Sequence, residues 1–157
     1  MKDEILNSKA RKLLFAMFKE QWDLDVNTLK EYVFIRKSSG KVFIMTKESA
    51  EVLNSMNIRV YSYGNYLGTV MNDSFRVSIE GSQLLGPLSK KNIIELDSDR
   101  IKGWVRGEDI ALSTDEAETL NGFCLVKNGT DFYGCGKATK DNLLNYVPKS
   151  RRIKNLS

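Results

Sequence analysis

The end of the sequence has a strong excess of basic over acidic side chains. From Lys137 to Ser157 there are six basic residues and one acidic residue, which gives a net charge of +5. A surface that neutralises several neighbouring phosphates releases their counterions, and each contact adds to the affinity. The pattern predicts a phosphate-binding edge, for which the candidate residues are Lys137, Lys149, Arg151, Arg152 and Lys154.

The segment before this end has the opposite charge. From Ile93 to Asp131 there are four basic and nine acidic residues, a net charge of −5 that would repel a phosphate backbone. The whole chain carries +4 and has an isoelectric point near 9.0, which favours polyanionic partners but also serves solubility. Basic tails are also common as disordered, solubilising ends, so two interpretations of the tail stay open.

Cysteine and histidine, which often carry catalysis or bind metals, are scarce or missing. The sequence has two cysteines and no histidine, which excludes tetrahedral Cys/His zinc sites and any Ser-His-Asp or Cys-His arrangement. The segment 134–137, Gly-Cys-Gly-Lys, resembles a phosphate loop, but Asp131 stands where that loop needs a glycine and Ala138 where it needs Ser or Thr. We therefore expect no catalytic residue, no metal and no cofactor, although carboxylate, Lys or Tyr chemistry is not excluded.

Hydropathy predicts a cytoplasmic protein without a membrane partner. The longest apolar stretch, Leu13 to Phe18, is far shorter than the roughly 20 residues of a membrane-spanning helix. The first 22 residues alternate charged and apolar side chains and contain neither a signal core nor a small-residue cleavage site.

Both cysteines lie in a segment that reads strand, turn, strand, from residue 121 to 137. Asn128-Gly129 is a strong turn signal. If Gly129-Thr130 are the central turn residues, Cys124 lies opposite Cys135; if Asn128-Gly129 are central, Cys124 faces Tyr133. Both registers stay open, and in either the thiols are expected to be reduced and buried.

Two further features of the second half have structural interpretations. We expect another backbone to pass close to Gly134 and Gly136, because neither has a side chain; it would belong either to a neighbouring strand or to RNA. The acidic group 115–118 lacks the alternating ligands of a calcium loop, so we expect a solvated loop there.

The first half combines helices and strands. Apolar residues at spacings of three and four predict a helix from Asp3 to Phe18. Tyr32–Arg36 and Lys41–Met45 read as a hairpin around the turn residues 37–40. A second helix is predicted over Lys47–Met56, followed by short extended segments at Arg59–Ser62, Leu67–Met71 and Phe75–Ile79.

A break rich in glycine and proline, from Glu80 to Leu88, separates this part from the rest. We therefore predict an N-terminal domain over residues 1–88 and a second domain over residues 91–157. The second domain is expected to be a small β-barrel, with a short helix at Ser98–Lys102 and strands at Ile93–Leu96, Trp104–Val105, Ile110–Leu112, Phe123–Lys127, Phe132–Lys137 and Leu144–Val147.

Several segments resemble known RNA-associated families. The hairpin at residues 121–137 resembles the closing hairpin of PUA domains, named from pseudouridine synthases and archaeosine transglycosylases, and residues 104–110 are similar to that family's earlier glycine-containing segment. Residues 145–153 resemble the end of the PUA-like domains of Sun/Nop-type RNA cytosine-C5 methyltransferases. Upstream, residues 59–70 and 75–87 resemble the α/β domain of the Nip-seven ribosome-biogenesis family, which also ends in a PUA domain.

These resemblances imply an α+β chain in which an N-terminal α/β domain precedes a small PUA-type β-barrel. They also imply a non-catalytic accessory factor of rRNA maturation or ribosome biogenesis. Its partners would be rRNA or a tRNA-like RNA, together with ribosomal or RNA-modifying proteins. Backbone amides near Gly107 would add RNA contacts, and the residues placed near the family's segments or the domain junction are Arg106, Lys127, Lys90 and Lys91.

Three alternatives accompany this reading. Aromatic residues could stack on unpaired bases, although most are expected in the core; they are Tyr61, Tyr63, Tyr66, Phe75, Trp104 and Tyr146. A protein-interaction adaptor with a merely solubilising tail is the second alternative. The third, an RNA-modifying enzyme, is disfavoured because no nucleophile–base arrangement is found.

Overall fold

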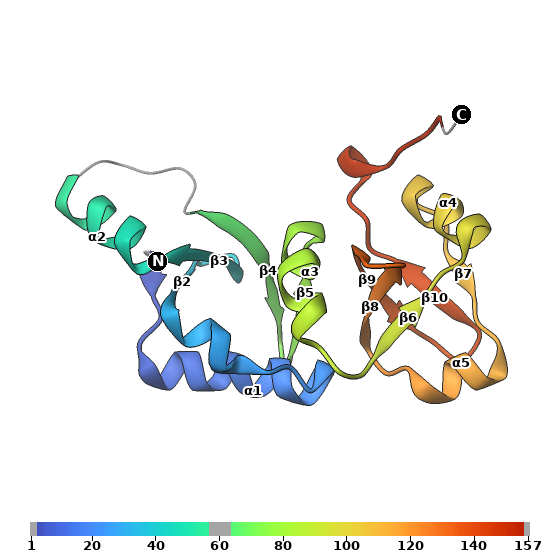
Figure 1. Ribbon diagram of the computed structural model, residues 1–157, viewed down its shortest axis with the longest axis horizontal. Coiled ribbons are helices and arrows are strands. Elements are labelled where there is room, and N and C mark those ends of the chain that lie inside the picture. The colour runs from blue at the N-terminus through green and yellow to red at the C-terminus, as the bar shows by residue number, and fades with distance from the viewer. Residues whose placement is uncertain (1–2, 57–63, 156–157) are drawn as a thin grey trace.

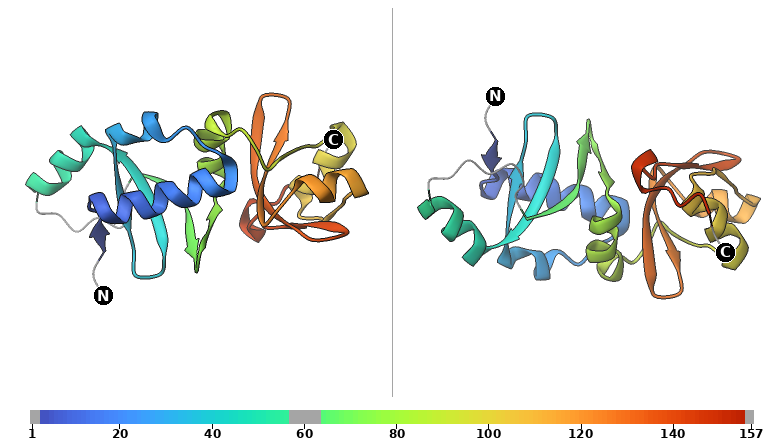
Figure 2. Two further views of the ribbon diagram at one scale, coloured as in Figure 1. Left: turned by 90° about the horizontal axis from the view of Figure 1, so that it is seen from below. Right: turned by 90° about the horizontal axis from the view of Figure 1, so that it is seen from above.

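The protein is an α+β chain built on two five-stranded sheets. The computed structural model describes residues 3–56 and 64–155. One sheet is formed before Leu88 and the other after it, and Figures 1 and 2 show the two parts side by side with helix α3 between them. The expected extended segment Arg59–Ser62 lies outside the described residues. In the part of the chain that is described, no helix is long and apolar enough to cross a bilayer.

The first sheet is an antiparallel meander whose strands follow one another in chain order. The hairpin expected at residues 32–45 is confirmed, and Gly40 closes its turn with a φ of +91°. Helix α2 is confirmed at its predicted bounds. The elements are β1 (Glu4–Ile5), β2 (Tyr32–Arg36), β3 (Lys41–Thr46), α2 (Lys47–Met56), β4 (Asn65–Met71) and β5 (Ser74–Val77), with a 3₁₀ turn η1 (Val26–Glu31) before β2.

Helix α1 (Ser8–Trp22) begins five residues later than the apolar spacing predicts and ends four residues later. The side chain of Asn7 accepts a hydrogen bond from the Ala10 amide at 2.9 Å and caps the helix there. Glu4 and Ile5 instead pair with β2. The prediction of a helix from Asp3 was therefore wrong, because pairing with a strand distant in sequence has no local signal.

One hydrophobic core joins the two sheets. The rings of Phe18 and Phe75 meet edge to face at 5.0 Å, and the Trp22 indole donates a hydrogen bond of 3.0 Å to the Phe123 carbonyl in the second sheet. The same cluster includes Phe132 and Cys135. Since this core crosses Leu88, the division into domains 1–88 and 91–157 stays a prediction.

The predicted break from Glu80 to Leu88 was wrong. The segment forms helix α3 (Ile79–Leu85) and a 3₁₀ turn, η2 (Gly86–Leu88). Ser78 caps α3 by accepting from the Gly81 amide at 2.8 Å. Gly81 and Gly86, which contributed to the predicted break, are instead sites of close packing. An added Cβ at Gly81 would lie 2.0 Å from the Leu67 carbonyl, and one at Gly86 would lie 2.4 Å from the Phe132 ring.

The second sheet curls into a half-barrel (Figure 1). Its strand order is β6-β8-β9-β10-β7, and only β6 with β8 is parallel. A second core beneath it is centred on the fully buried Trp104. The elements are β6 (Ile93–Glu95), α4 (Ser98–Arg106), β7 (Ile110–Ala111), α5 (Thr114–Thr119), β8 (Phe123–Asn128), β9 (Asp131–Ala138), β10 (Asn142–Asn145) and η3 (Lys149–Arg151).

Three predictions for this half were wrong. Trp104 and Val105 belong to α4 and not to a strand, because the Trp104 side chain is drawn into the core and donates a 2.9 Å hydrogen bond to the Tyr133 carbonyl. The expected acidic loop is helix α5, capped by a reciprocal pair between Ser113 and Glu116. The strand expected at Leu144–Val147 is β10, which covers Asn142–Asn145 instead. The side-chain amide of Asn145 donates a 2.8 Å hydrogen bond to the Trp104 carbonyl.

The β8–β9 hairpin settles the open register. Gly129 and Thr130 are the central turn residues, one of the two alternatives. A bulge between Leu125 and Lys127 shifts the pairing by one residue, so Cys124 lies opposite Gly136 and neither expected cysteine pairing occurs. Both thiols are free and buried, as expected.

Gly136 confirms the expected close approach. An added Cβ would lie 2.6 Å from the Trp104 ring and 2.7 Å from the Leu144 carbonyl of β10. Gly134 is required for a different reason, a φ of +84° that L residues rarely adopt.

Candidate nucleic-acid interface

The basic tail is folded against the second sheet and helix α4. The amide of Ile153 donates a 2.8 Å hydrogen bond to the Val105 carbonyl in α4, and η3 forms one tight turn before it. Val147, just upstream, is buried in the second core. The tail therefore follows a fixed path up to Ile153, beside α4 in Figure 1, which disagrees with a disordered tail over these residues.

Arg152 holds this path in place. Its guanidinium lies so close above Gly107 that an added Cβ would approach Arg152 Nε to 2.3 Å, and Nε donates a 3.2 Å hydrogen bond to the Val147 carbonyl. The cation also lies at the C-terminal end of α4, where the helix dipole favours positive charge. Arg152 thus positions the tail through contacts within the protein, independently of any contact with a ligand.

The backbone amides near Gly107, which were expected to contact RNA, form hydrogen bonds within the protein. The Gly107 amide donates to the Trp104 carbonyl and the Glu108 amide to the Gly103 carbonyl, each at 3.0 Å. These bonds form the left-handed cap of α4. These two amides are therefore already used within the protein, and an RNA contact through the backbone near Gly107 stays a prediction.

Arg151 reaches away from the tail and forms an ion pair with Glu80 on α3. Both side chains are roughly half exposed, at 48% and 43%. Burial alone would raise the pKa of Glu80, but the hydrogen bond and charge of Arg151, with the Glu80 backbone amide, lower the pKa below its ordinary value. The carboxylate therefore stays charged at neutral pH and competes with any phosphate for Arg151.

Three lysines complete the edge. Lys137, Lys149 and Lys154 are exposed, and within residues 3–56 and 64–155 none of them forms an ion pair with a carboxylate. Lys137 lies with its ammonium 5.7 Å from the Phe123 ring centre. The Phe123 ring in turn packs against Tyr146, three residues before Lys149, so Lys137 is joined to the start of the tail.

The other candidate residues are placed differently. Arg106 lies beside the tail, since its neighbours Val105 and Gly107 contact Ile153 and Arg152, and its guanidinium is 3.9 Å from Glu108. Lys127 pairs with Phe132 near the hairpin turn, at the opposite end of β8 from Lys137's partner Phe123. Lys90 and Lys91 are exposed, and their amides bind the Trp22 carbonyl. The structure thus groups Arg106 with the edge and separates Lys127 from it.

The aromatic candidates divide into two groups. Phe75 and Trp104 are fully buried, as expected for core residues. Tyr66 and Tyr146 are half-buried and line a groove between the two parts of the molecule. Tyr61 and Tyr63 lie outside the described residues.

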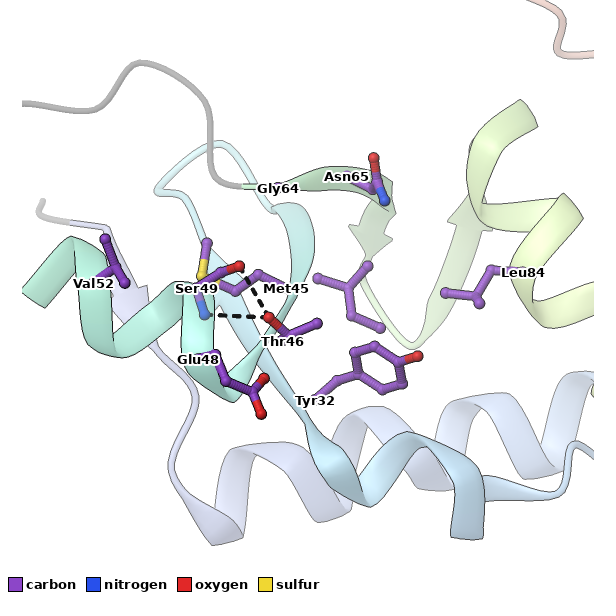
Figure 3. A pocket seen from close by; sticks show the side chains of 10 residues that line it. Tyr32, Met45, Thr46, Glu48, Ser49, Val52, Gly64, Asn65 and Leu84 are labelled. Carbon is purple, nitrogen blue, oxygen red and sulfur yellow. Dashed lines mark hydrogen bonds between the residues drawn. The ribbon is translucent and has the colours of Figure 1, made fainter.

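A larger pocket, of about 660 Å³, lies in the first half between β3, α2 and β4. Figure 3 shows its mainly apolar wall, with Tyr32, Met45 and Leu84 facing the space and Thr46 hydrogen-bonded to Ser49. Among the described residues that line it, Glu48 is the sole charged side chain. A carboxylate without a cation does not favour a phosphate, so the lining of this pocket does not suit a nucleic-acid backbone.

The second sheet and its tail define a small β half-barrel with a basic edge. Residues 91–153 match the family model described as the methyltransferase RsmF PUA domain. The C-terminal part of the chain is therefore a PUA domain, as expected, and such a domain suggests RNA binding. No curated relative matches the chain.

Proposed function

We propose that this protein binds structured RNA through the basic edge of its PUA domain. Three exposed lysines and Arg151 form the contact surface, and Arg106 extends it along α4. The observation that carries the proposal is the folded tail, which holds Lys149 and Arg151 in place and carries Lys154 directly after its last anchored residue, Ile153. Lys137 is joined to the start of this tail through the Phe123 and Tyr146 rings. An unfolded solubilising tail would need no anchor such as Arg152 over Gly107.

The acidic first part of the domain supports this placement. The carboxylates of residues 93–131 would repel phosphates over the remaining surface of the domain, so the RNA backbone is directed to the tail. Phosphate contacts position an RNA without reading its sequence. We therefore propose recognition by shape.

We also propose that the protein has no catalytic activity of its own and acts in the cytoplasm as an accessory factor in rRNA maturation. The resemblance of residues 59–70 and 75–87 to the Nip-seven family supports this role, and ribosomal or RNA-modifying proteins would be its protein partners. Pull-down from a lysate with and without nuclease tests it. The role requires rRNA in the captured material, and its absence would overturn the role. Ribosomal proteins that remain after nuclease treatment would be direct protein partners.

The binding proposal is tested with the double variant Lys149→Ala/Lys154→Ala. Loss of two phosphate contacts should weaken binding to a stem–loop RNA and reduce the slope of log K against log salt by about 1.4 to 1.8. The matched control is Lys12→Ala/Lys19→Ala, which removes two exposed lysines from α1. Equal affinity and slope for the tail variant and the wild type would overturn the proposal.

A further inference from the structure

We propose that the groove between the two parts of the molecule binds one unpaired nucleotide of the RNA, its base against Tyr146 and its phosphate on Arg76. This inference rests on the proposed function and extends the RNA path from the tail towards the first sheet. The groove has a volume of about 270 Å³. That is just below the range of about 300–1,000 Å³ for drug-sized ligand sites, and it suits a single nucleoside.

Arg76 is the residue that points to a ligand. It lies on β5 between Phe75 and Val77, both buried, so strand alternation places Arg76 on the opposite face. Its side chain is half-buried, and within residues 3–56 and 64–155 it has no carboxylate partner. No carboxylate of the described residues therefore occupies the Arg76 guanidinium, which is available to bind an RNA phosphate through charge-assisted hydrogen bonds.

The aromatic wall of the groove is assembled from both parts of the chain. The Arg76 guanidinium lies 5.7 Å from the Tyr146 ring centre, and the Tyr146 ring packs edge to face on Phe123 at 5.4 Å. Lys137 lies over the far ring, Phe123. The result is a row of cation, ring, ring and cation that ends at the basic edge. Phe123 is buried, so Tyr146 is the ring of this row that can stack on an unpaired base.

The remaining polar groups of the groove are already bonded. The Tyr66 hydroxyl is 2.5 Å from that of Thr69, and the Ser78 hydroxyl donates to the Tyr66 carbonyl at 2.7 Å while it caps α3. Glu80 is the groove's only carboxylate among its lining residues, and Arg151 neutralises it. Two arginines against one carboxylate leave a net positive groove, which matches a phosphodiester.

The nucleotide must be unpaired, because only a base free of its helix can turn its face to Tyr146. The stem of a structured RNA would rest on the tail lysines, and the single strand leaving that stem would enter the groove. This arrangement uses both halves of the protein in one contact.

The test compares two RNA probes by fluorescence anisotropy with the full chain. One is a stem–loop with a five-nucleotide 3′ extension, and the other has the same backbone with all five extension bases removed. The variants are Arg76→Ala, Arg76→Lys and Tyr146→Leu, with Lys12→Ala as the control. Circular dichroism checks that each variant is folded, and Arg76→Lys keeps the charge while losing the planar stacking group.

We expect Tyr146→Leu to weaken binding to the normal probe about five-fold or more, the size of one base–aromatic stack, and to leave the abasic probe unaffected. Arg76→Ala should weaken binding to both probes. Arg76→Lys, which keeps the charge, should come closer to the wild-type affinity for the abasic probe than for the normal probe. Unchanged binding by both groove variants would overturn the inference, as would equal weakening of the two probes by Tyr146→Leu. If the wild type binds neither probe, the proposed function itself fails; if only the tail variant loses binding, the groove inference fails alone.

Discussion

Replacing Glu80 with glutamine should strengthen RNA binding. Glu80 holds Arg151 in an ion pair at the junction of α3 and the tail. Glutamine keeps the shape of the side chain and removes its charge, so Arg151 becomes free for a phosphate. The carboxylate that would repel the same phosphate is lost at the same time.

The size of the gain follows from Coulomb's law. Two like charges about 6 Å apart, roughly the separation expected for Glu80 and a phosphate bound to Arg151, repel by about 0.7 kcal/mol at the dielectric constant of water and about 2.8 kcal/mol at an effective value of 20. Salt at about 0.15 M screens part of this. Breaking the exposed ion pair costs at most about 1 kcal/mol of stability. We expect binding about three- to ten-fold tighter.

The assay is an anisotropy titration with the stem–loop RNA at two salt concentrations. Glu31→Gln is the matched control, because Glu31 also forms an exposed ion pair, in its case with Lys47 at 3.8 Å, in the first half of the chain and far from the tail. The gain for Glu80→Gln should shrink at higher salt. Since the pKa of Glu80 is lowered, the gain should stay constant between about pH 6 and 8. Unchanged or weaker binding would refute the role of Arg151.

Three further predictions concern stability and reactivity. The two hydrogen bonds from Arg100, with the capping bond from Ser113, outweigh burial and lower the pKa of Glu116. The charged form of Glu116 therefore stabilises the fold at any pH above its ordinary pKa of 4.5. This stability is lost as the pH falls through the lower pKa of the folded state. In urea titrations Glu116→Gln should cost about 1–2 kcal/mol at pH 7 and much less at pH 3, and a pH-independent difference would contradict the assignment. Gly136→Ala should lower the free energy of unfolding by about 1–3 kcal/mol because it overpacks the core at Trp104; an unchanged urea midpoint would argue against this packing. Burial raises the pKa of Cys124 to about 11 and of Cys135 to about 12, so a thiol reagent at pH 8 should modify both only after denaturation, and rapid labelling of the native protein would exclude their burial.

Local signals in the sequence predicted those elements whose turns and caps are local. The β2–β3 hairpin, helix α2 and the turn at Gly129 were found because glycine and polar turn residues act within a few positions. Elements that depend on distant partners were missed. Trp104 favours a strand by propensity. In the structure it lies on α4, and its ring packs in the core of the second sheet, so tertiary packing overrides propensity.

The same distinction holds for the candidate interface. Counting charges was enough to find the tail lysines, since residues close in sequence stay close on a folded tail. Charge counting could not show that Arg152 is fixed over Gly107 or that Glu80 holds Arg151. Arg76 was missed altogether, because its partner Tyr146 lies 70 residues further along the chain and only the fold brings them together.

Mass-spectrometric footprinting of lysines tests the central claim, that RNA lies on the basic edge of the PUA domain. The full chain is acetylated briefly with and without a saturating stem–loop RNA, and the modification of each lysine is compared. We predict protection of Lys137, Lys149 and Lys154, with Lys12 and Lys19 on α1 modified equally in both samples. Protection of the α1 lysines while the three edge lysines stay reactive would contradict the account.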